Sequence, residues 1–465
     1  MRIGVSQTRD RNFCNGSKET HLLSIRFLAG LKNYAYQVIG NEVSTLAKYY
    51  DSIVQWNCQN EGALLKVLKG HKISVIKSSD IEEVRKLFGA NLILLDGNIN
   101  HSYDIQGLFE LLKSAMNRKS RIMAVIYNPY FRFVFQIMNW LGLRNAELPT
   151  TFISRTTLTN LATLSGFEVC RVQPVLQCPI KMGFLGPFLN ACLRVIPGVR
   201  WMGFAAVVTL RPIFQEVERP SLSIVIPARN EAGNIENVFC RLRNLEMFPV
   251  QIIFVEGHSK DNTWDKIQEA IRNYKGPFKL NAYQQTGKGK KNAVREGFEK
   301  ATGELLTILD ADLTMPPESI IRFYEAYCKG KGDFINGSRL VYPMQSGSMQ
   351  FLNHLGNIFF AKALSFVTDA QLSDSLCGTK LISREHYECV RRWCDDFGDF
   401  DPFGDFELIF PAVVLGLGTI DLPIRYQART YGTTNISRFQ HGWQLLRMTL
   451  IGLFTFKMGR LPRNR

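Results

Sequence analysis

The sequence predicts an α/β protein with two doubly wound domains, each a mostly parallel sheet between layers of helices. Short β-branched runs alternate with amphipathic stretches along the chain, a pattern typical of parallel sheets covered by helices. The alternation stops and restarts around the polar, proline-broken segment Glu216–Pro220. The 465 residues are enough for two or three separate cores.

The first series of strands and helices is expected over residues 21–215, after a polar segment, residues 1–20, that we expect to be frayed. Amphipathic stretches such as Leu108–Lys113 separate its strands. The expected strands are Ser52–Val54, Ile73–Ile76, Asn91–Leu95, Ile122–Tyr127, Glu168–Val172 and Phe204–Thr209.

The second series forms a separate domain over residues 216–465. Its expected strands are Leu222–Ile226, Gln251–Val255, Lys279–Tyr283, Leu305–Leu309 and Asp333–Asn336. Near its end, Trp443–Met458 is apolar apart from residues such as Arg447 and Lys457, which predicts an amphipathic helix. Packing on its own domain and docking on a membrane surface are equally consistent with that pattern.

A net charge of +15 favours an acidic partner. The basic residues are scattered, without the interleaved aromatic and basic motif of RNA-recognition modules, so nucleic acid is not expected. An anionic membrane surface or a nucleotide substrate suits the charge better.

The ten cysteines include no CxxC pair and no cluster at zinc spacing, which favours a reducing compartment. The N-terminus has no apolar region typical of a signal peptide. The nearest candidate for a membrane span, Phe184–Phe214, is interrupted by arginines and prolines. We therefore expect a cytoplasmic protein, either free in solution or peripheral on the inner face of the cell membrane.

Polar residues follow the first two strands of the second domain. Pro227 is expected to stop the first strand, and Asn230 or Glu231 to cap the next helix, which leaves a crevice at the strand's carboxyl end. The second strand is followed by Glu256, an acid placed to accept hydrogen bonds from a base or ribose. Either segment alone is more typical of an ordinary turn.

A glycine-lysine loop follows at Gly287–Lys291, ahead of a helix expected over Val294–Lys300. Glycines, lysines and a helix N-terminus together make a natural diphosphate cradle, although a solvated charged face has the same composition. The strand Leu305–Leu309 then delivers two carboxylates, Asp310 and Asp312, to its carboxyl end. Because unpaired buried carboxylates are unfavourable, they predict a divalent cation, Mg²⁺ or Mn²⁺, that bridges them to a diphosphate.

In this order the motifs resemble glycosyltransferase family 2, with its GT-A fold, and most closely the dolichyl-phosphate-mannose-synthase-like branch, over about residues 220–445. The resemblance implies that Asp310 and Asp312 hold the metal and the diphosphate. The set that we expect to bind the nucleotide sugar is Pro227, Ala228, Arg229, Glu231, Glu256, Ser259, Asp261, Lys288, Lys290, Asp310, Arg339 and Arg438.

Later segments match further family motifs. Asn336–Arg339 matches a Gly-Ser-Arg segment, and Asp374–Lys380 matches an Asp-x-x-Cys-Gly-x-Lys loop near the acceptor. Phe403–Leu408 resembles the segment with the acids near the sugar, and Arg429–Arg438 the basic loop that closes over the diphosphate. The resemblance thus implies an acceptor site at Asp374, Gly378 and Asn435, and catalytic roles for Asp405, Glu407 and Arg429.

Asp405 and Glu407, two residues apart, do not share a helix face, so one of them should face the site. Asp405 is the first choice and Glu407 the second. The sequence departs from the family with Glu256 in place of Asp, Thr314 where Gln is frequent, and Asn435 where many members have Lys.

The implied reaction is direct displacement with inversion, in which an acceptor oxygen attacks a UDP- or GDP-linked sugar and basic groups stabilise the leaving diphosphate. A hydroxyl acceptor on a glycan would need a base such as Asp405, whereas an ionised polyprenyl phosphate would need none.

The N-terminal series resembles a class I S-adenosylmethionine-dependent methyltransferase, notably at Ala162–Val169. Its expected cofactor loop, Gln55–Gly62, keeps only Gly62, and larger side chains occupy positions where backbone must approach the cofactor. The ribose-binding acid expected after the second strand is replaced at Val75–Ser78. We expect an inactive domain that does not bind S-adenosylmethionine and serves docking, acceptor recognition or scaffolding.

Two other functions are compatible with the sequence. A scaffold with both halves inactive predicts no metal-dependent nucleotide binding, and the intact Asp310 and Asp312 pair argues against it. A bifunctional methyl- and glycosyltransferase requires cofactor binding despite the bulky loop.

Overall fold

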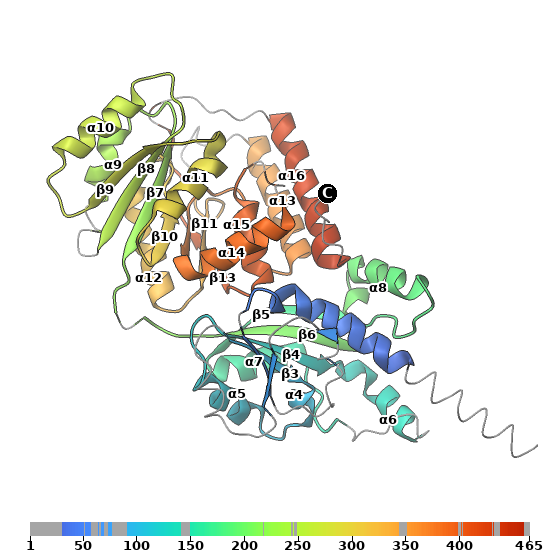
Figure 1. Cartoon of the computed structure of the whole chain (residues 1–465). Helices are drawn as coiled ribbons and strands as arrows, with labels where there is room; N and C mark the ends of the chain where they lie inside the picture. Colours follow the sequence, from blue (N-terminus) through green and yellow to red (C-terminus); the bar gives the residue numbers. More distant parts are fainter. Residues whose placement is uncertain are drawn as a thin grey trace, which may run out of the picture.

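The computed structural model describes residues 30–459 except 51, 57–63, 65–66, 69–72, 77–90, 141–148, 217, 243–244, 246–248, 344–350, 399–400, 402, 430 and 432–437. Within these residues two sheets form, one in each half of the chain (Figure 1). Three predictions concern residues outside the described part of the chain. They are the fraying expected at the N-terminus, the cofactor loop after Trp56 and the ribose-binding position after Ile76.

The N-terminal sheet has the order β2-β1-β3-β4-β6-β5, and all six predicted strands are present. β6 pairs antiparallel with β4 and β5, whereas β1, β2, β3 and β4 pair parallel. The strands are β1 (Ser52–Trp56), β2 (Ile73–Ile76), β3 (Asn91–Asp96), β4 (Arg121–Tyr127), β5 (Phe167–Val175) and β6 (Ala205–Pro212).

Helices cover both faces of this sheet. α5 (Ile105–Lys113) and α7 (Arg155–Leu164) pack on one face around Phe109 and Leu158. The helix at residues 30–47 packs on the other face, in a core cluster that continues into the C-terminal half. The remaining elements are α4 (Asn98–His101), the turn η1 (Pro129–Phe131), α6 (Arg132–Trp140), α8 (Leu185–Val195) and the turn η2 (Val199–Trp201).

The C-terminal sheet has the order β13-β11-β12-β10-β7-β8-β9, with β12 antiparallel to both neighbours. The five predicted strands are β7 (Leu222–Ala228), β8 (Val250–Glu256), β9 (Lys279–Gln284), β10 (Leu305–Ile308) and β11 (Phe334–Ser338). Two further strands were not predicted, β12 (Lys380–Ser383) and β13 (Thr419–Pro423).

The helices of this half follow their strands in the doubly wound pattern. They are α9 (Ile235–Arg241), α10 (Thr263–Asn273), α11 (Gly289–Lys300), α12 (Ile320–Cys328), α13 (Phe351–Thr368), α14 (Arg384–Phe397), α15 (Phe406–Val414) and α16 (Arg438–Gly452), with the turns η4 (Pro317–Ser319) and η5 (Leu453–Lys457).

Three local predictions were wrong. Pro227 does not stop β7: pairing with β10 ends opposite Val225, so the missing N–H of Pro227 lies on an open side while β8 pairing continues. Asn234, rather than Asn230 or Glu231, stands at the N-cap position of the next helix, and its side chain makes no capping hydrogen bond. α11 begins at Gly289, five residues before the predicted start, which brings Lys290 into its first turn.

The predicted amphipathic helix is α16. It packs along α13, and its other side exposes Trp443, Leu446 and Leu450. No helix in the described part of the chain is both long and apolar enough to cross a membrane.

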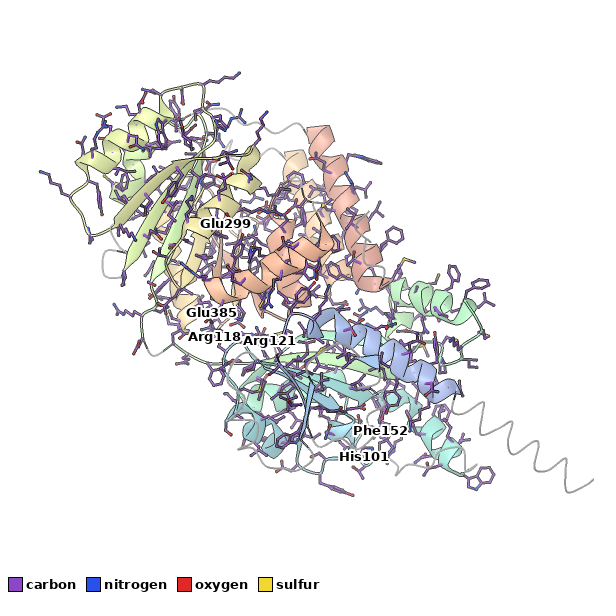
Figure 2. All side chains as sticks on the ribbon, viewed as in Figure 1. His101, Arg118, Arg121, Phe152, Glu299 and Glu385 are labelled. Carbon is purple, nitrogen blue, oxygen red and sulfur yellow. The ribbon has the colours of Figure 1, made fainter. Side chains whose placement is uncertain are left out.

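A buried carboxylate joins the two sheets. Asp333, directly before β11, is fully buried and accepts from Arg118 at 2.8 Å and from Arg121 at 2.8 Å, with Arg211 at 3.4 Å. Figure 2 shows Arg118 and Arg121 at the junction of the two halves. Although burial acts to raise it, the arginines hold the pKa of Asp333 well below its usual range.

Asp333→Asn should destabilise the protein by about 3–5 kcal/mol, because it leaves three desolvated guanidinium groups short of a negative charge. Chemical denaturation measures the free energy of unfolding. The control Asp395→Asn removes an exposed carboxylate and should change stability by less than about 0.5 kcal/mol. Equal effects of the two substitutions would contradict the role given to Asp333.

His386 should make stability depend on pH. Burial lowers the pKa of His386 to about 3, whereas an unfolded histidine titrates near its ordinary value of about 6.5. Between these values only the unfolded state binds the proton, so stability falls as pH falls. Between about pH 6.5 and about pH 5, wild type should lose up to about 1.4 kcal/mol more per pH unit than His386→Asn, measured by urea unfolding. Parallel pH profiles would refute this.

Candidate active site

The carboxyl ends of β7, β8 and β10 meet at one edge of the C-terminal sheet, because these strands are parallel. There they border an open cleft of about 880 Å³. Ten of the predicted site residues line it: Pro227, Ala228, Arg229, Glu231, Asp261, Lys290, Asp310, Asp312, Asp405 and Arg429. The cleft also includes Phe403 and Tyr431, which sequence reasoning did not select.

Asp310 leaves β10 facing the first turn of α11. Its Oδ1 lies 2.5 Å from Nζ of Lys290. Burial acts to raise the pKa of Asp310, but the Lys290 ammonium outweighs it and holds that pKa below its usual range. Gly378 packs against this pair so closely that a Cβ at this position would overlap Asp310 Oδ2 and Lys290 Nζ. A glycine is therefore needed at position 378, because it lets the backbone approach Asp310 and Lys290 closely.

Asp312 is held from two sides. Thr314 donates from its hydroxyl to Asp312 Oδ1 at 2.8 Å, and Arg429 Nη2 lies 2.6 Å from Asp312 Oδ2. Arg429 also reaches Glu231 Oε1 at 3.4 Å. Burial raises the pKa of Glu231 to about 7, although Asn234 and Arg429 act to lower it. Thr314, noted in the sequence only as a departure, thus orients Asp312.

The turn after β8 is tied to the turn after β7. Ser259 donates from its backbone N–H to Glu256 Oε1 at 2.5 Å, and its hydroxyl accepts from the backbone N–H of Asn230 at 3.0 Å. Glu256, Ser259 and Lys288 do not line the cleft. Asn230, His258 and Leu313 each have a positive φ, between 55° and 57°, so backbone strain gathers at this edge.

Asp405, directly before α15, faces the cleft. Its Oδ1 accepts from Nζ of Lys380, a lysine that is almost completely buried and also donates to the carbonyl of Cys377. Asp401 fixes this loop by accepting from the backbone N–H groups of Phe403 and Phe406. Lys380 was quoted as the last residue of a motif but was not selected as a site residue.

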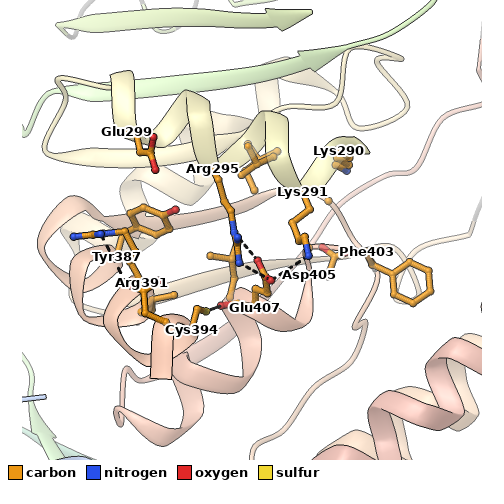
Figure 3. A pocket seen from close by; sticks show the side chains of 17 residues that line it. Lys290, Lys291, Arg295, Glu299, Tyr387, Arg391, Cys394, Phe403, Asp405 and Glu407 are labelled. Atoms are coloured by element: carbon orange, nitrogen blue, oxygen red, sulfur yellow. Dashed lines mark hydrogen bonds and ion pairs between the residues drawn. The ribbon is translucent and has the colours of Figure 1, made fainter. Parts of the chain in front are cut away.

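Glu407 faces a different space. It forms a bidentate pair with Arg295 at 2.7 and 2.9 Å, and Lys291 lies 3.4 Å away. Figure 3 shows Glu407 among these cations in a neighbouring cavity of about 140 Å³, behind α11. Of the two acids, only Asp405 borders both this cavity and the larger cleft.

Arg339 and Asp374 form a bidentate pair with each other at 2.7 and 2.9 Å, and neither lines the cleft. Their separate roles toward nucleotide and acceptor stay predictions. Asn435 and the side chain of Arg438 lie outside the described residues.

The comparisons with known proteins match the part of the chain that forms this edge of the sheet. The family model described as glycosyl transferase family 2 matches residues 223–391, which include both acids of the Asp-Ala-Asp turn. Residues 223–391 form a family 2 glycosyltransferase domain. The predicted membership is thereby confirmed for this part of the chain.

Two curated relatives match this domain at similar levels of sequence identity. A dolichol-phosphate mannosyltransferase of Pyrococcus furiosus is 30% identical over 222 residues, 46% of this chain and 59% of the relative. An undecaprenyl-phosphate 4-deoxy-4-formamido-L-arabinose transferase of Aeromonas hydrophila is 31% identical over 219 residues, 45% of this chain and 61% of the relative. The match thus spans about three fifths of each relative's length.

Among solved structures, glucosyl-3-phosphoglycerate synthase of Mycobacterium tuberculosis, in a complex with Mn²⁺ and UDP, is similar over 52% of this chain and 80% of its own. The sequence identity is 17% and the TM-score 0.37. Values this low carry no argument about ligands or mechanism.

Gly378→Ala should weaken metal-dependent binding of a nucleoside diphosphate by about tenfold or more, because the new methyl group displaces Asp310 and Lys290. Isothermal calorimetry with UDP and GDP in the presence of Mn²⁺ measures the affinity. The control is Gly356→Ala in α13, where a Cβ would meet nothing within 4 Å. Unchanged affinity in Gly378→Ala would contradict the close packing described.

Proposed function

We propose that this chain transfers a sugar, with inversion, from a nucleoside diphosphate to a polyprenyl phosphate, in a metal-dependent reaction. The observation that carries the proposal is the pair Asp310 and Asp312 on the cleft edge of a family 2 domain, each paired with a cation. A glycan acceptor remains the alternative outcome of the test below.

The residues present fit a divalent cation. Two carboxylates on one turn supply hard oxygen ligands, as Mg²⁺ and Mn²⁺ prefer. Among the described residues no group of three or more acids, histidines or cysteines surrounds a metal position, so Asp310 and Asp312 would leave most of the coordination to water and phosphate oxygens. Such an ion would stabilise negative charge on the leaving diphosphate.

The cations of the cleft have a second role in this proposal. Lys290 and Arg429 are part-exposed and neutralise the two carboxylates of the turn. When metal and diphosphate bind, both side chains would turn to the diphosphate, where they oppose the charge that develops during transfer. The N-terminus of α11, at Gly289, adds unpaired backbone N–H groups on the same side.

The contacts of the two acids and the names of the relatives favour a phosphate acceptor. Asp405 shares its Oδ1 with the buried Lys380, and Glu407 is held by Arg295 and Lys291. Both acids therefore already have cationic partners. An ionised phosphate needs no base, and both relatives described above are named for polyprenyl-phosphate acceptors. Asp405 then serves to hold the sugar through its other oxygen.

For the N-terminal half we propose a methyltransferase-like domain without catalysis. Its support is the sequence resemblance at Ala162–Val169 together with a sheet of order β2-β1-β3-β4-β6-β5 in which β6 is antiparallel to both neighbours. The bulky side chains of the cofactor loop support the lack of catalysis. We place the protein at the inner face of the cell membrane, where a lipid acceptor is found.

The donor assignment predicts that one UDP-, GDP- or dTDP-sugar raises the melting temperature only when Mg²⁺ or Mn²⁺ is present. Asp312→Ala should abolish this shift, whereas Asp265→Ala, an exposed acid on α10, should keep it. A shift that survives Asp312→Ala would overturn the assignment. With the sugar identified, transfer to a polyprenyl phosphate rather than to a glycan decides the acceptor.

A further inference from the structure

The N-terminal half exposes a cluster of large apolar side chains around α8. Phe184 is 79% exposed, Phe188 52% and Leu185 45%. They stand at the start of α8, after the segment with Lys181 and Met182, which is also exposed. Contiguous exposed apolar side chains mark interaction surfaces in soluble proteins. The proposed donor site does not use them.

This cluster continues onto the C-terminal half. α8 contacts η5, the turn that ends α16, and Gln173 Nε2 donates to the carbonyl of Phe456 at 3.4 Å. The joint is fixed by charge, because Arg200 and Lys457 pair with Asp369 at 2.7 and 2.6 Å. α8 therefore keeps a fixed position at the end of α16, on the same side of the molecule (Figure 1).

α16 also has a stripe of exposed apolar side chains, which runs toward the contact between α8 and η5. Trp443 is 70% exposed, and Leu446, Leu450 and Phe454 follow at intervals of three or four residues, the spacing of one helix face. Together α16, η5 and α8 present one apolar edge drawn from both halves of the chain.

The two segments that form this edge contain no acidic residue, and their exposed cations include Lys181 before α8 and Arg447 on α16. Residues 169–215, which contain α8, include one Lys, four Arg and no Asp or Glu. Residues 422–465, which contain α16, include one Lys, seven Arg and no Asp or Glu. Exposed apolar and aromatic side chains, with exposed cations and no acid in the same segments, are complementary to the interface of an anionic bilayer. A protein partner would not require acidic residues to be absent from both segments.

We infer that α8 docks the N-terminal half on an anionic lipid bilayer, in one surface with α16. The start of α8 inserts Phe184, Leu185 and Phe188 between headgroups, and Lys181 meets lipid phosphates. The N-terminal half thus provides a second membrane contact, which fixes the orientation of the cleft relative to the membrane. The orienting role of the N-terminal half rests on the proposed lipid acceptor, whereas the docking itself does not.

The test uses the full chain and sedimentation with vesicles of phosphatidylglycerol mixed with phosphatidylcholine. Wild type should bind these vesicles and lose binding when the vesicles are pure phosphatidylcholine. The double variant Phe184→Glu, Phe188→Glu should bind about tenfold or more weakly. The matched control is Tyr103→Glu, Leu164→Glu, two side chains 91% and 70% exposed beside α5 and α7, which should bind as wild type does.

Several outcomes would overturn the inference: no binding of wild type to anionic vesicles, equal binding by the Phe184 and Phe188 variant, or equal loss in the control. Self-association through α8, seen as a dimer that the Phe184 and Phe188 variant abolishes, would also overturn it. Transfer to a water-soluble short-chain isoprenyl phosphate should be unchanged in the variant, while transfer to a vesicle-embedded acceptor falls. If no isoprenyl phosphate accepts sugar, the proposed function fails while the vesicle result still stands.

Discussion

The position of the two halves relative to each other depends on the Asp333 carboxylate, enclosed by Arg118, Arg121 and Arg211. Two more acids complete the balance, since Arg118 also pairs with Glu216 and Arg211 with Glu168. Three cations and three anions therefore meet at the junction, with Asp333, Arg121 and Arg211 almost fully buried. A shift of either half would leave charges in a low-dielectric region without partners, which is far less favourable than losing an exposed ion pair.

The proposed donor cleft contains the same kind of ion pair between a carboxylate and a cation, but there the pairs are exposed to solvent. Lys290 is 40% exposed and Arg429 25%, so both pairs are open to solvent, and in the proposed reaction each cation would exchange its carboxylate for the diphosphate. At Asp333 the partners are sealed from water and the geometry is permanent. Burial, rather than the type of residue, thus separates the pairs that hold the fold from those that can be exchanged for a ligand.

The same distinction explains what the sequence could predict. Strands such as β7 and β10 are continuous apolar runs buried on both faces, so their positions follow from composition alone. The Asp-Ala-Asp turn was predictable because a strand end places its carboxylates together. Asp333 was seen only as the start of a strand, since its arginines lie more than 100 residues away in the chain and no local pattern links them. Thr314 and Lys380 were visible in motifs, but their contacts with Asp312 and Asp405 depend on loops whose geometry the sequence does not state.

The apolar segments near α8 show the limit most clearly. The segment Phe184–Phe214 was considered as a membrane span because it is apolar. Hydropathy alone does not distinguish a buried strand from an exposed helix, and in the fold this segment contains both α8 and β6. Only the packed structure shows that Val208 is buried while Phe184 faces solvent.

The chain between Arg429 and Arg438 links the cleft to the edge formed by α16 and α8. Arg429 holds Asp312 of the donor site, and nine positions later Arg438 begins α16. The cleft and the proposed membrane surface are therefore adjacent in the chain, since Tyr431 of the cleft precedes the start of α16 by seven residues.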